Sequence, residues 1–219
     1  MTFRSSPVGL NKGRATLAVV SLGLLAALSM SDAGAADAAK GKVLAYTCHG
    51  CHGVPDYRNS YPNYRVPKLG GQNEAYLLSA LNAYASGDRP HPTMHAQAVT
   101  LSAEDRANIA AFFQAQGPLP NKEVVGTPPP ATQTCVACHG ADGAKTVAPD
   151  YPMLASQPAD YIVHALKDYK SGKRKNPIMA GIISGVDEKD FEALAEFFSR
   201  QQALCTTDQV EKHGKCESE

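Results

Sequence analysis

The 219-residue chain contains no tryptophan, only 7% aromatic residues, and as many acidic as basic side chains. Nucleic-acid-binding proteins usually carry a basic excess, so the balanced charge argues against a nucleic-acid partner. No segment beyond residue 35 is apolar enough to span a membrane, and none shows the sustained polar–apolar alternation of a β-strand. These absences favour an all-α protein with no transmembrane segment in residues 36–219.

The first 35 residues have the layout of a secretory signal peptide. Basic residues up to Arg14 precede the uncharged apolar run 15–30, and an Ala-x-Ala cleavage site ends at Ala35. An uncleaved N-terminal anchor is the alternative, although the run is shorter than the ~20 residues of a spanning helix. We predict that residues 1–35 are a signal peptide and that the chain is exported to the periplasm.

Residues 67–116 and 152–201 are two copies of one sequence pattern. At an offset of 85 residues they align without a gap, and 17 of the 50 positions are identical. Each copy follows a Cys-x-x-Cys-His cluster, formed by Cys48, Cys51 and His52 and by Cys135, Cys138 and His139. A repeat of this size indicates two domains of the same design.

A proline-rich segment separates the two copies. Residues 117–131 contain five prolines, which favour an extended linker over a helix. Together with the repeat, this segment predicts a domain 1 at residues 36–116, a domain 2 at residues 132–203 and a C-terminal tail at residues 204–219.

Both predicted domains show the periodicity of amphipathic helices. In domain 1 it predicts a helix over residues 73–86, closed by Gly87, and a second helix that begins after Ser102 and ends near Gln116. Ser102 is followed three residues later by Asp105, as in a capping box. Domain 2 repeats the second helix with an acidic cap and four inward-facing apolar residues: Asp187, Phe191, Leu194, Phe197 and Phe198.

The two Cys-x-x-Cys-His clusters determine the chemistry that we expect. A structural zinc site needs four nearby ligands, and a thioredoxin-like motif would accompany a βαβ pattern, which the sequence lacks. Cys-x-x-Cys-His is the attachment motif of c-type haem, in which two thiols add to the haem vinyl groups and the histidine binds iron. Two clusters predict two covalently bound haem c groups. The attachment residues are Cys48, Cys51, Cys135 and Cys138, and the histidine ligands are His52 and His139.

A methionine at the same position of each repeat completes the predicted ligand sets. Met94 and Met179 are 85 residues apart, and each ends a Pro-x-Met sequence. His91 and His95 flank Met94, and imidazole is also a good iron ligand, so a histidine ligand at the first haem stays open as an alternative. Met153 has no methionine counterpart in the first repeat and is assigned to the core.

Pro67 and Pro152 open a Pro-x-Leu sequence in both repeats. A metal-bound histidine usually donates its other ring N–H to a fixed acceptor. A carbonyl of this loop is the natural candidate for that acceptor, and a plain turn proline is the alternative interpretation.

Five sequences recur in both repeats over about residues 40–201: Cys-x-x-Cys-His-Gly, Pro-x-Leu-x-x-Gln, Gly-x-Arg, Pro-x-Met and Phe-Phe. Together they resemble class I cytochrome c, and their doubling resembles the dihaem cytochrome c4 family. The resemblance implies an all-α fold of two tandem class I cytochrome c domains, each wrapped around one covalent haem. The two domains would face each other across a pseudo-twofold axis. His91 departs from the family, which tends to have asparagine at this position.

The resemblance also implies a function. It predicts a periplasmic carrier, not an enzyme, that delivers electrons from a respiratory donor to a terminal oxidase or another redox enzyme. One alternative is a dedicated dihaem subunit of a sulfide- or alcohol-oxidising dehydrogenase complex. The other is a dihaem enzyme, such as a peroxidase or a thiosulfate-oxidising cytochrome. An enzyme needs an open or exchangeable iron position, and a methionine in each repeat argues against one.

The tail contains the two cysteines that the haem clusters leave over, Cys205 and Cys216. An exported protein rarely keeps a pair of thiols free in an oxidising compartment. We therefore predict a Cys205–Cys216 disulfide that pins the tail to the end of the last helix.

Two predictions concern the surface of the second repeat. A group of basic residues precedes Met179 and is a candidate docking surface for an acidic partner, with a solvated helix end as the alternative. Its members are Lys167, Lys170, Lys173, Arg174 and Lys175. His164 has no counterpart in the first repeat and is also expected at the surface.

Overall fold

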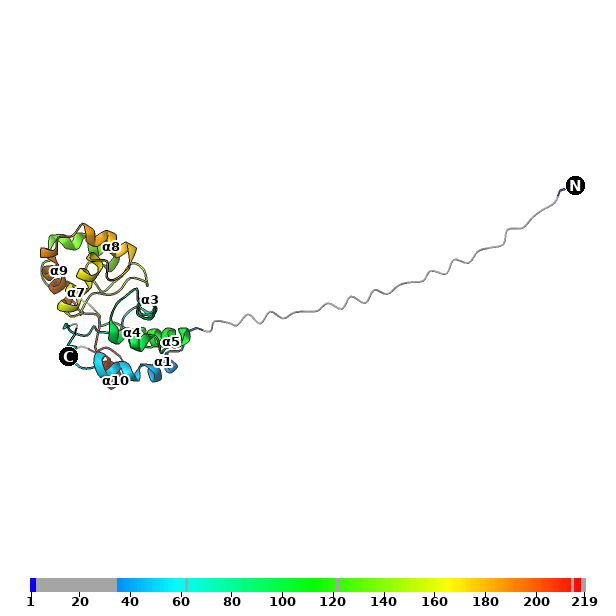
Figure 1. Ribbon diagram of the computed structural model, residues 1–219, viewed down its shortest axis with the longest axis horizontal. Coiled ribbons are helices and arrows are strands. Elements are labelled where there is room, and N and C mark those ends of the chain that lie inside the picture. Colours follow the sequence, from blue (N-terminus) through cyan, green and yellow to red (C-terminus); the bar gives the residue numbers. More distant parts are fainter. Residues whose placement is uncertain (3–34, 62, 121–122, 214, 218–219) are drawn as a thin grey trace. The chain divides into compact units, whose positions relative to one another are not determined.

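The structure is a computed structural model that describes residues 1–2, 35–61, 63–120, 123–213 and 215–217 (Figure 1). The predicted signal peptide lies almost entirely outside the described residues. All elements discussed below belong to one compact unit, Ala35–Glu219. The described residues form α- and 3-10 helices and no strand beyond two isolated bridges, which confirms the all-α prediction. No helix in this part of the chain is long and apolar enough to cross a membrane.

The helices follow the repeat. The first repeat contains α1 (Ala38–Leu44), η1 (Ala45–Cys48), α2 (His49–His52), α3 (Glu74–Ser86), α4 (Pro92–Ala98) and α5 (Ala103–Gln114). The second contains η2 (Pro130–Thr132), α6 (Gln133–His139), α7 (Ala159–Lys170), α8 (Pro177–Ser184), η3 (Glu188–Asp190) and α9 (Phe191–Ser199). The tail contains α10 (Thr207–His213). The helices α3, α4 and α5 thus correspond to α7, α8 and α9.

Local sequence signals set the ends of the helices. α3 ends where Gly87 adopts a left-handed φ of 86°, a conformation that favours glycine. α5 begins with a reciprocal capping box, in which the Ser102 hydroxyl accepts the N–H of Asp105 and the Asp105 carboxylate accepts the N–H of Ser102. Both predicted helices are confirmed, although α5 ends at Gln114, slightly earlier than predicted.

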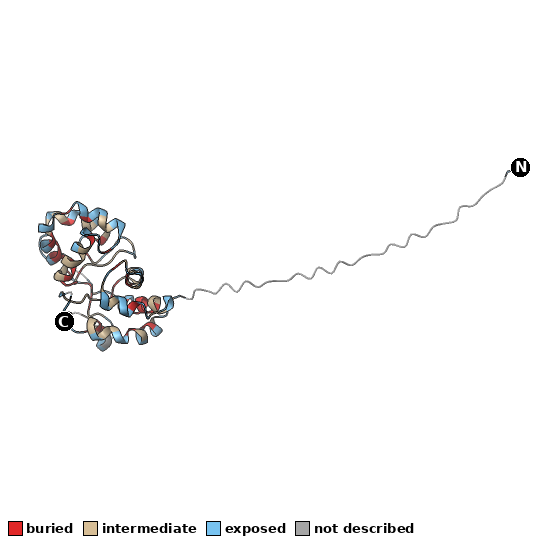
Figure 2. Ribbon diagram, viewed as in Figure 1, coloured by how far each residue is buried: buried red, intermediate tan, exposed pale blue. Residues whose placement is uncertain are grey.

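Each repeat has its own core. α1 packs against α5 in the first repeat, and α7 packs against α9 in the second. The paired phenylalanines at the ends of α5 and α9, together with apolar residues of α3 and α7, fill the space between these helices. Figure 2 shows the buried residues on the inward-facing sides of the helices and the exposed residues on their outward-facing sides.

Two glutamines at equivalent positions tie the repeats together. Gln72 donates its amide N–H to the carbonyl of Met153 (3.0 Å) and accepts the N–H of Met153 (2.8 Å). Gln157 makes the same pair of hydrogen bonds with the backbone of Lys68 (2.9 and 3.0 Å). Because both pairs of residues are 85 positions apart, the contacts are reciprocal. The two repeats therefore face each other across a pseudo-twofold axis.

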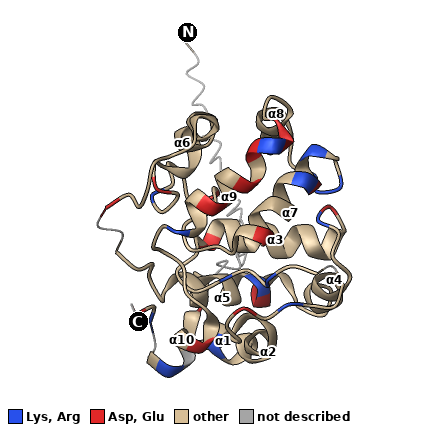
Figure 3. Cartoon of the chain, turned by 90° about the vertical axis from the view of Figure 1, so that its left-hand side faces the viewer, with Lys and Arg blue, Asp and Glu red and all other residues tan. Residues whose placement is uncertain are grey.

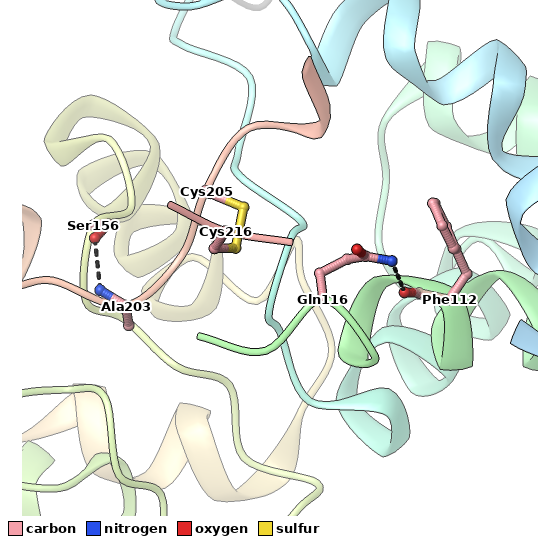
Figure 4. The surroundings of a disulfide bond; sticks show 6 residues. All are labelled: Phe112, Gln116, Ser156, Ala203, Cys205 and Cys216. Atoms are coloured by element: carbon pink, nitrogen blue, oxygen red, sulfur yellow. Dashed lines mark hydrogen bonds between the residues drawn. A yellow bond between two sulfur atoms is a disulfide. The ribbon is translucent and has the colours of Figure 1, made fainter. Parts of the chain in front are cut away.

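The C-terminal tail departs from one prediction. Cys205 and Cys216 form the predicted disulfide, with a Cα–Cα distance of 5.5 Å. However, Cys205 exchanges two backbone hydrogen bonds with Gly70 (3.1 Å each), and the N–H of Cys216 donates to the carbonyl of Gln116 (3.3 Å). Figure 4 shows the disulfide near Gln116, which follows the end of α5. The prediction that the disulfide pins the tail to α9 is wrong, because Val210 and Cys205 are buried in the core of the first repeat.

The glutamine contacts yield a prediction about stability. Gln72→Ala leaves the partly buried backbone N–H and C=O of Met153 without their side-chain partner. We expect the free energy of unfolding of the holoprotein, measured in urea, to fall by about 1–3 kcal/mol. Gln133→Ala, at an exposed position of α6, is the matched control. Equal stability of the two variants would show that the reciprocal contacts do not hold the repeats together.

Candidate haem sites

Each Cys-x-x-Cys-His cluster shares a cavity with the methionine predicted to be its partner. The first cavity has a volume of about 400 Å³, and its lining includes Cys48, Cys51, His52 and Met94. The second has a volume of about 230 Å³, and its lining includes Cys135, Cys138, His139 and Met179. The structure therefore brings the eight predicted site residues together in two groups of four, one in each repeat.

A proline carbonyl fixes each cluster histidine. Nδ1 of His52 lies 2.7 Å from the carbonyl oxygen of Pro67, and Nδ1 of His139 lies 2.8 Å from that of Pro152. Because a carbonyl only accepts, each Nδ1 donates its proton and the free lone pair is on Nε2. Burial lowers the pKa of His52 to about 4, against the effect of the Pro67 carbonyl, and it also lowers the pKa of His139. Both rings are therefore neutral, as metal ligation requires, and the predicted carbonyl acceptors are confirmed.

Cys48 and Cys135 are not activated thiols. Burial raises the pKa of the Cys48 thiol to about 11 and also raises the pKa of the Cys135 thiol. Catalytic and redox-active thiols have a lowered pKa, so these two residues lack the character of a disulfide oxidoreductase site. No group of three or more His, Cys, Asp or Glu side chains in the described part of the chain could hold a metal ion directly. The raised pKa values of Cys48 and Cys135 oppose the thiol-redox alternative.

The two methionines lie in the first turns of the equivalent helices α4 and α8. Oδ1 of Asn176 accepts the N–H of Met179 (3.0 Å), and Nδ1 of His91 accepts the N–H of Met94 (3.2 Å). His91 therefore replaces asparagine as the N-cap of α4, and the lone pair of its Nδ1 is occupied by this hydrogen bond. The departure from the family pattern thus has a structural explanation.

The other residues considered as ligands have different surroundings. His95 is exposed and does not line the first cavity, and its Nδ1 lies 2.8 Å from the carbonyl oxygen of Tyr84. Met153 lines the second cavity, but it packs with the small buried cluster around Leu204, and Gln72 holds its backbone. Its assignment to the core agrees with this packing.

The two cavities share a wall. Six residues line both of them: Gln72, Tyr76, Ala80, Arg89, Gln157 and Tyr161. Four of the six come from the first repeat and two from the second. Only this thin, largely polar wall therefore separates the cavities.

Two buried arginines, one from each repeat, each donate a hydrogen bond to a tyrosine of the other repeat. Arg89 donates to the hydroxyl of Tyr161 (2.8 Å), and Arg174 donates to the hydroxyl of Tyr76 (3.2 Å). The arginines are 8% and 9% exposed, and neither has a carboxylate partner among the described residues. Burial alone raises the pKa of Tyr76, but Arg174 and Arg89 outweigh burial and lower it to about 7. The wall thus carries positive charge that no carboxylate of the described residues balances.

These residues fit a covalently bound haem in each cavity. Buried charges are almost always paired, and each haem carries two propionate carboxylates that would pair with the guanidinium groups. The remaining donors are a thiol pair for attachment, a neutral imidazole and a thioether. This donor set suits a c-type haem and no other cofactor considered above.

One contact between the repeats was missed by the sequence analysis. Tyr64, from a loop before α3, stacks on His164 of α7 with ring centroids 4.2 Å apart. Nε2 of His164 also lies 3.0 Å from the carboxylate of Asp168. His164 lies at the surface as predicted, with 34% of its side chain exposed, although Tyr64 covers one face of its ring. The loop that carries Tyr64 does not align with the second repeat, so the repeat pattern gave no signal of this contact.

The basic group before Met179 is smaller at the surface than the sequence suggested. Figure 3 shows basic residues near α7 and α8. However, Arg174 is buried and donates to Tyr76 of the wall between the cavities, and Lys175 pairs with Asp88 of the first repeat (3.0 Å). Lys170 donates to the carbonyl of Val186. Part of this charge is therefore used within the molecule, which weakens the docking interpretation.

Known proteins resemble the chain over most of its length. Cytochrome c4 of Pseudomonas aeruginosa is 32% identical to it, over 82% of this chain and 96% of the relative. The chain belongs to the cytochrome c4 family. The reduced crystal structure of cytochrome c4 from Pseudomonas stutzeri covers 76% of this chain and all of that one, with 30% identity and a TM-score of 0.60. The Cytochrome c family pattern matches residues 131–201.

Family membership fixes the cofactor and the general activity of this cytochrome. The chain is a dihaem c-type cytochrome of two tandem class I domains, and it binds two covalent haem c groups. It is an electron-transfer protein. A further relative is named thiosulfate dehydrogenase electron acceptor, from Stutzerimonas stutzeri, and is 29% identical over 71% of this chain and 79% of the relative.

The cap at α4 can be tested by substitution. We expect His91→Ala to lower the free energy of unfolding by about 1 kcal/mol, because the N–H of Met94 loses its acceptor. His91→Asn should retain most of the stability, since Asn176 makes the same contact in the second repeat. Urea unfolding of the two variants provides the comparison. Identical losses in His91→Ala and His91→Asn would contradict the capping role.

Proposed function

We propose that the eight residues assembled in the two cavities hold the haems. Cys48 and Cys51 attach haem 1, and His52 and Met94 are its iron ligands. In the second repeat, Cys135 and Cys138 attach haem 2, and His139 and Met179 are its iron ligands. The observation that supports this assignment is the joint placement of a thiol pair, a carbonyl-bound histidine and a methionine on each cavity.

Each bound haem supplies a one-electron iron couple. The chain contributes two protein ligands to each iron, so neither site leaves a position open for a substrate. The Pro67 and Pro152 carbonyls hold the imidazoles in one orientation and one tautomer, which limits the rearrangement that accompanies a change of oxidation state. This arrangement suits an electron carrier better than a peroxidase or another dihaem enzyme.

The shared wall supports electron exchange between the two haems of one molecule. The same side chains line both cavities, so no layer of bulk protein separates the two sites. Arg89 and Arg174, one from each repeat, would balance propionate charge on both sides of this wall. An electron received at one haem can then leave from the other.

The proposal includes a domain organisation and a location. Domain 1 spans residues 36–116 and domain 2 spans residues 132–203, with the linker 117–131 between them and the tail 204–219 after them. Residues 1–35 act as a cleaved signal peptide, and the mature protein works in the periplasm. Its partners are a respiratory electron donor and an oxidase or another redox enzyme.

A second candidate function is a fixed electron acceptor for one dehydrogenase. The similarity to a thiosulfate dehydrogenase electron acceptor favours it over other dedicated roles. The two functions differ in kinetics. A free carrier, reduced by its donor, should be reoxidised by a membrane oxidase preparation, whereas a dedicated acceptor should be reduced rapidly only by its own dehydrogenase. Stopped-flow spectroscopy of haem reduction and oxidation with each enzyme separates them.

The ligand assignment predicts the behaviour of two variants. The native reduced protein should bind no carbon monoxide, because both irons have two protein ligands. Met94→Ala and Met179→Ala should each bind one carbon monoxide per chain, since alanine offers no donor atom, and the double variant should bind two. Carbon monoxide difference spectra provide the count. A Met94→Ala protein that still excludes carbon monoxide would make His91 the better candidate for the ligand.

A further inference from the structure

The tail is part of the first repeat rather than an appendage of the second. After α9 the chain crosses to Gly70, where Cys205 forms an antiparallel bridge, and it returns to Gln116 at Cys216. The disulfide closes this loop at the two points where it contacts the first repeat. Between them, Val210 of α10 is 3% exposed and belongs to the core around Phe113. The helix α10 itself lies with the helices of the first repeat (Figure 1).

The backbone of Gly70 depends on the tail for its hydrogen bonds. In the second repeat the equivalent residue is Ala155, whose N–H donates to the carbonyl of Gly143 within that repeat (3.1 Å). In the first repeat the N–H of Gly70 donates instead to the carbonyl of Cys205 (3.1 Å). Because a buried N–H without an acceptor is costly, the tail carbonyl takes over a function that the second repeat fulfils by itself.

The sequence at this position reflects the close approach of the tail. A methyl group on Gly70 would collide with the Sγ of Cys205 and would lie 2.9 Å from Cγ2 of Val210. The second repeat has alanine at the equivalent position, which packs with Ala203 and Leu204 and not against the disulfide. Glycine is therefore required in the first repeat because the disulfide lies directly against its backbone.

The tail also contacts the two segments that set the position of His52. Gly70 lies three residues after Pro67, whose carbonyl accepts the Nδ1–H of His52 at 2.7 Å. On the other side, α10 packs against α2, the short helix that contains Cys51 and His52. Both partners of the histidine–carbonyl hydrogen bond are thus held by the same disulfide-closed loop.

We propose that the loop Cys205–Cys216 is a clamp that positions the histidine ligand of haem 1 and sets the reduction potential of that haem alone. This proposal rests on the assignment of His52 as the ligand of haem 1. A strong hydrogen bond to Pro67 makes the imidazole more basic and favours the ferric iron. Loosening the clamp weakens that bond, so the potential of haem 1 rises while that of haem 2 is unchanged.

The experiment uses the full-length holoprotein in a Met179→Ala background. Loss of Met179 removes the far-red methionine–iron band of haem 2 and lowers its potential, so the remaining band and the upper redox wave report on haem 1. If this substitution does not remove one of the two methionine bands, the ligand assignment fails, and that failure is independent of the clamp. Spectroelectrochemical titration gives the two waves, and urea titration of the remaining band gives the stability of the haem-1 ligation.

Two variants loosen the clamp in different ways. Cys205→Ala/Cys216→Ala opens the loop. Gly70→Ala keeps the disulfide, but its methyl group prevents the disulfide from packing against the backbone of residue 70. Lys212→Ala, at an exposed position of α10, is the matched control. We expect both clamp variants to have a higher reduction potential of haem 1 than the control, with the reduction potential of haem 2 unchanged. We also expect them to lose the haem-1 methionine band at lower urea concentrations than the control. Haem-1 waves that stay in place in both variants, or equal shifts of the two waves, would overturn the proposal.

Discussion

The hydrogen bond between a cluster histidine and a proline carbonyl is the contact on which both sites depend. It joins the helix that ends each Cys-x-x-Cys-His cluster to the loop that follows, and it leaves the lone pair of Nε2 free for the proposed bond to iron. Other contacts serve to hold these loops. Gln157 fixes Lys68 next to Pro67, and Gln72 fixes Met153 next to Pro152. The interface between the repeats therefore also supports the proposed ligands.

The two repeats make matching contacts at the wall between the cavities, but they differ in structure away from this wall. Arg89 and Arg174 make matching contacts across the boundary, which gives the two sites similar electrostatic surroundings on their facing sides. The differences lie at the periphery. The first repeat has a histidine cap at α4 and carries the disulfide, whereas the second has an asparagine cap and no disulfide packed on it. Two haems in similar folds can acquire different potentials from such peripheral differences.

The sequence predicted the elements that the repeat encodes. The spacing of the clusters and of Met94 and Met179 predicted two groups of four residues, and the structure places each group on one cavity. The shared Pro-x-Leu identified the carbonyl acceptors. These features are local or duplicated. Contacts made by unrepeated segments were not predictable in the same way. The seat of the tail on Gly70 and the stacking of Tyr64 on His164 depend on how distant segments pack, and no periodicity encodes that packing. The burial of Arg174 within an apparent surface group has the same cause.

The central claim is that one chain holds two haems, each with two ligands from the protein. The most direct test is the absorption spectrum of the purified protein in its ferric and ferrous states, combined with haem and protein quantification. The account predicts two haem c groups per chain, both low-spin in both oxidation states, with a methionine–iron band in the ferric spectrum. One haem per chain, or a ferric spectrum dominated by high-spin iron, would contradict it.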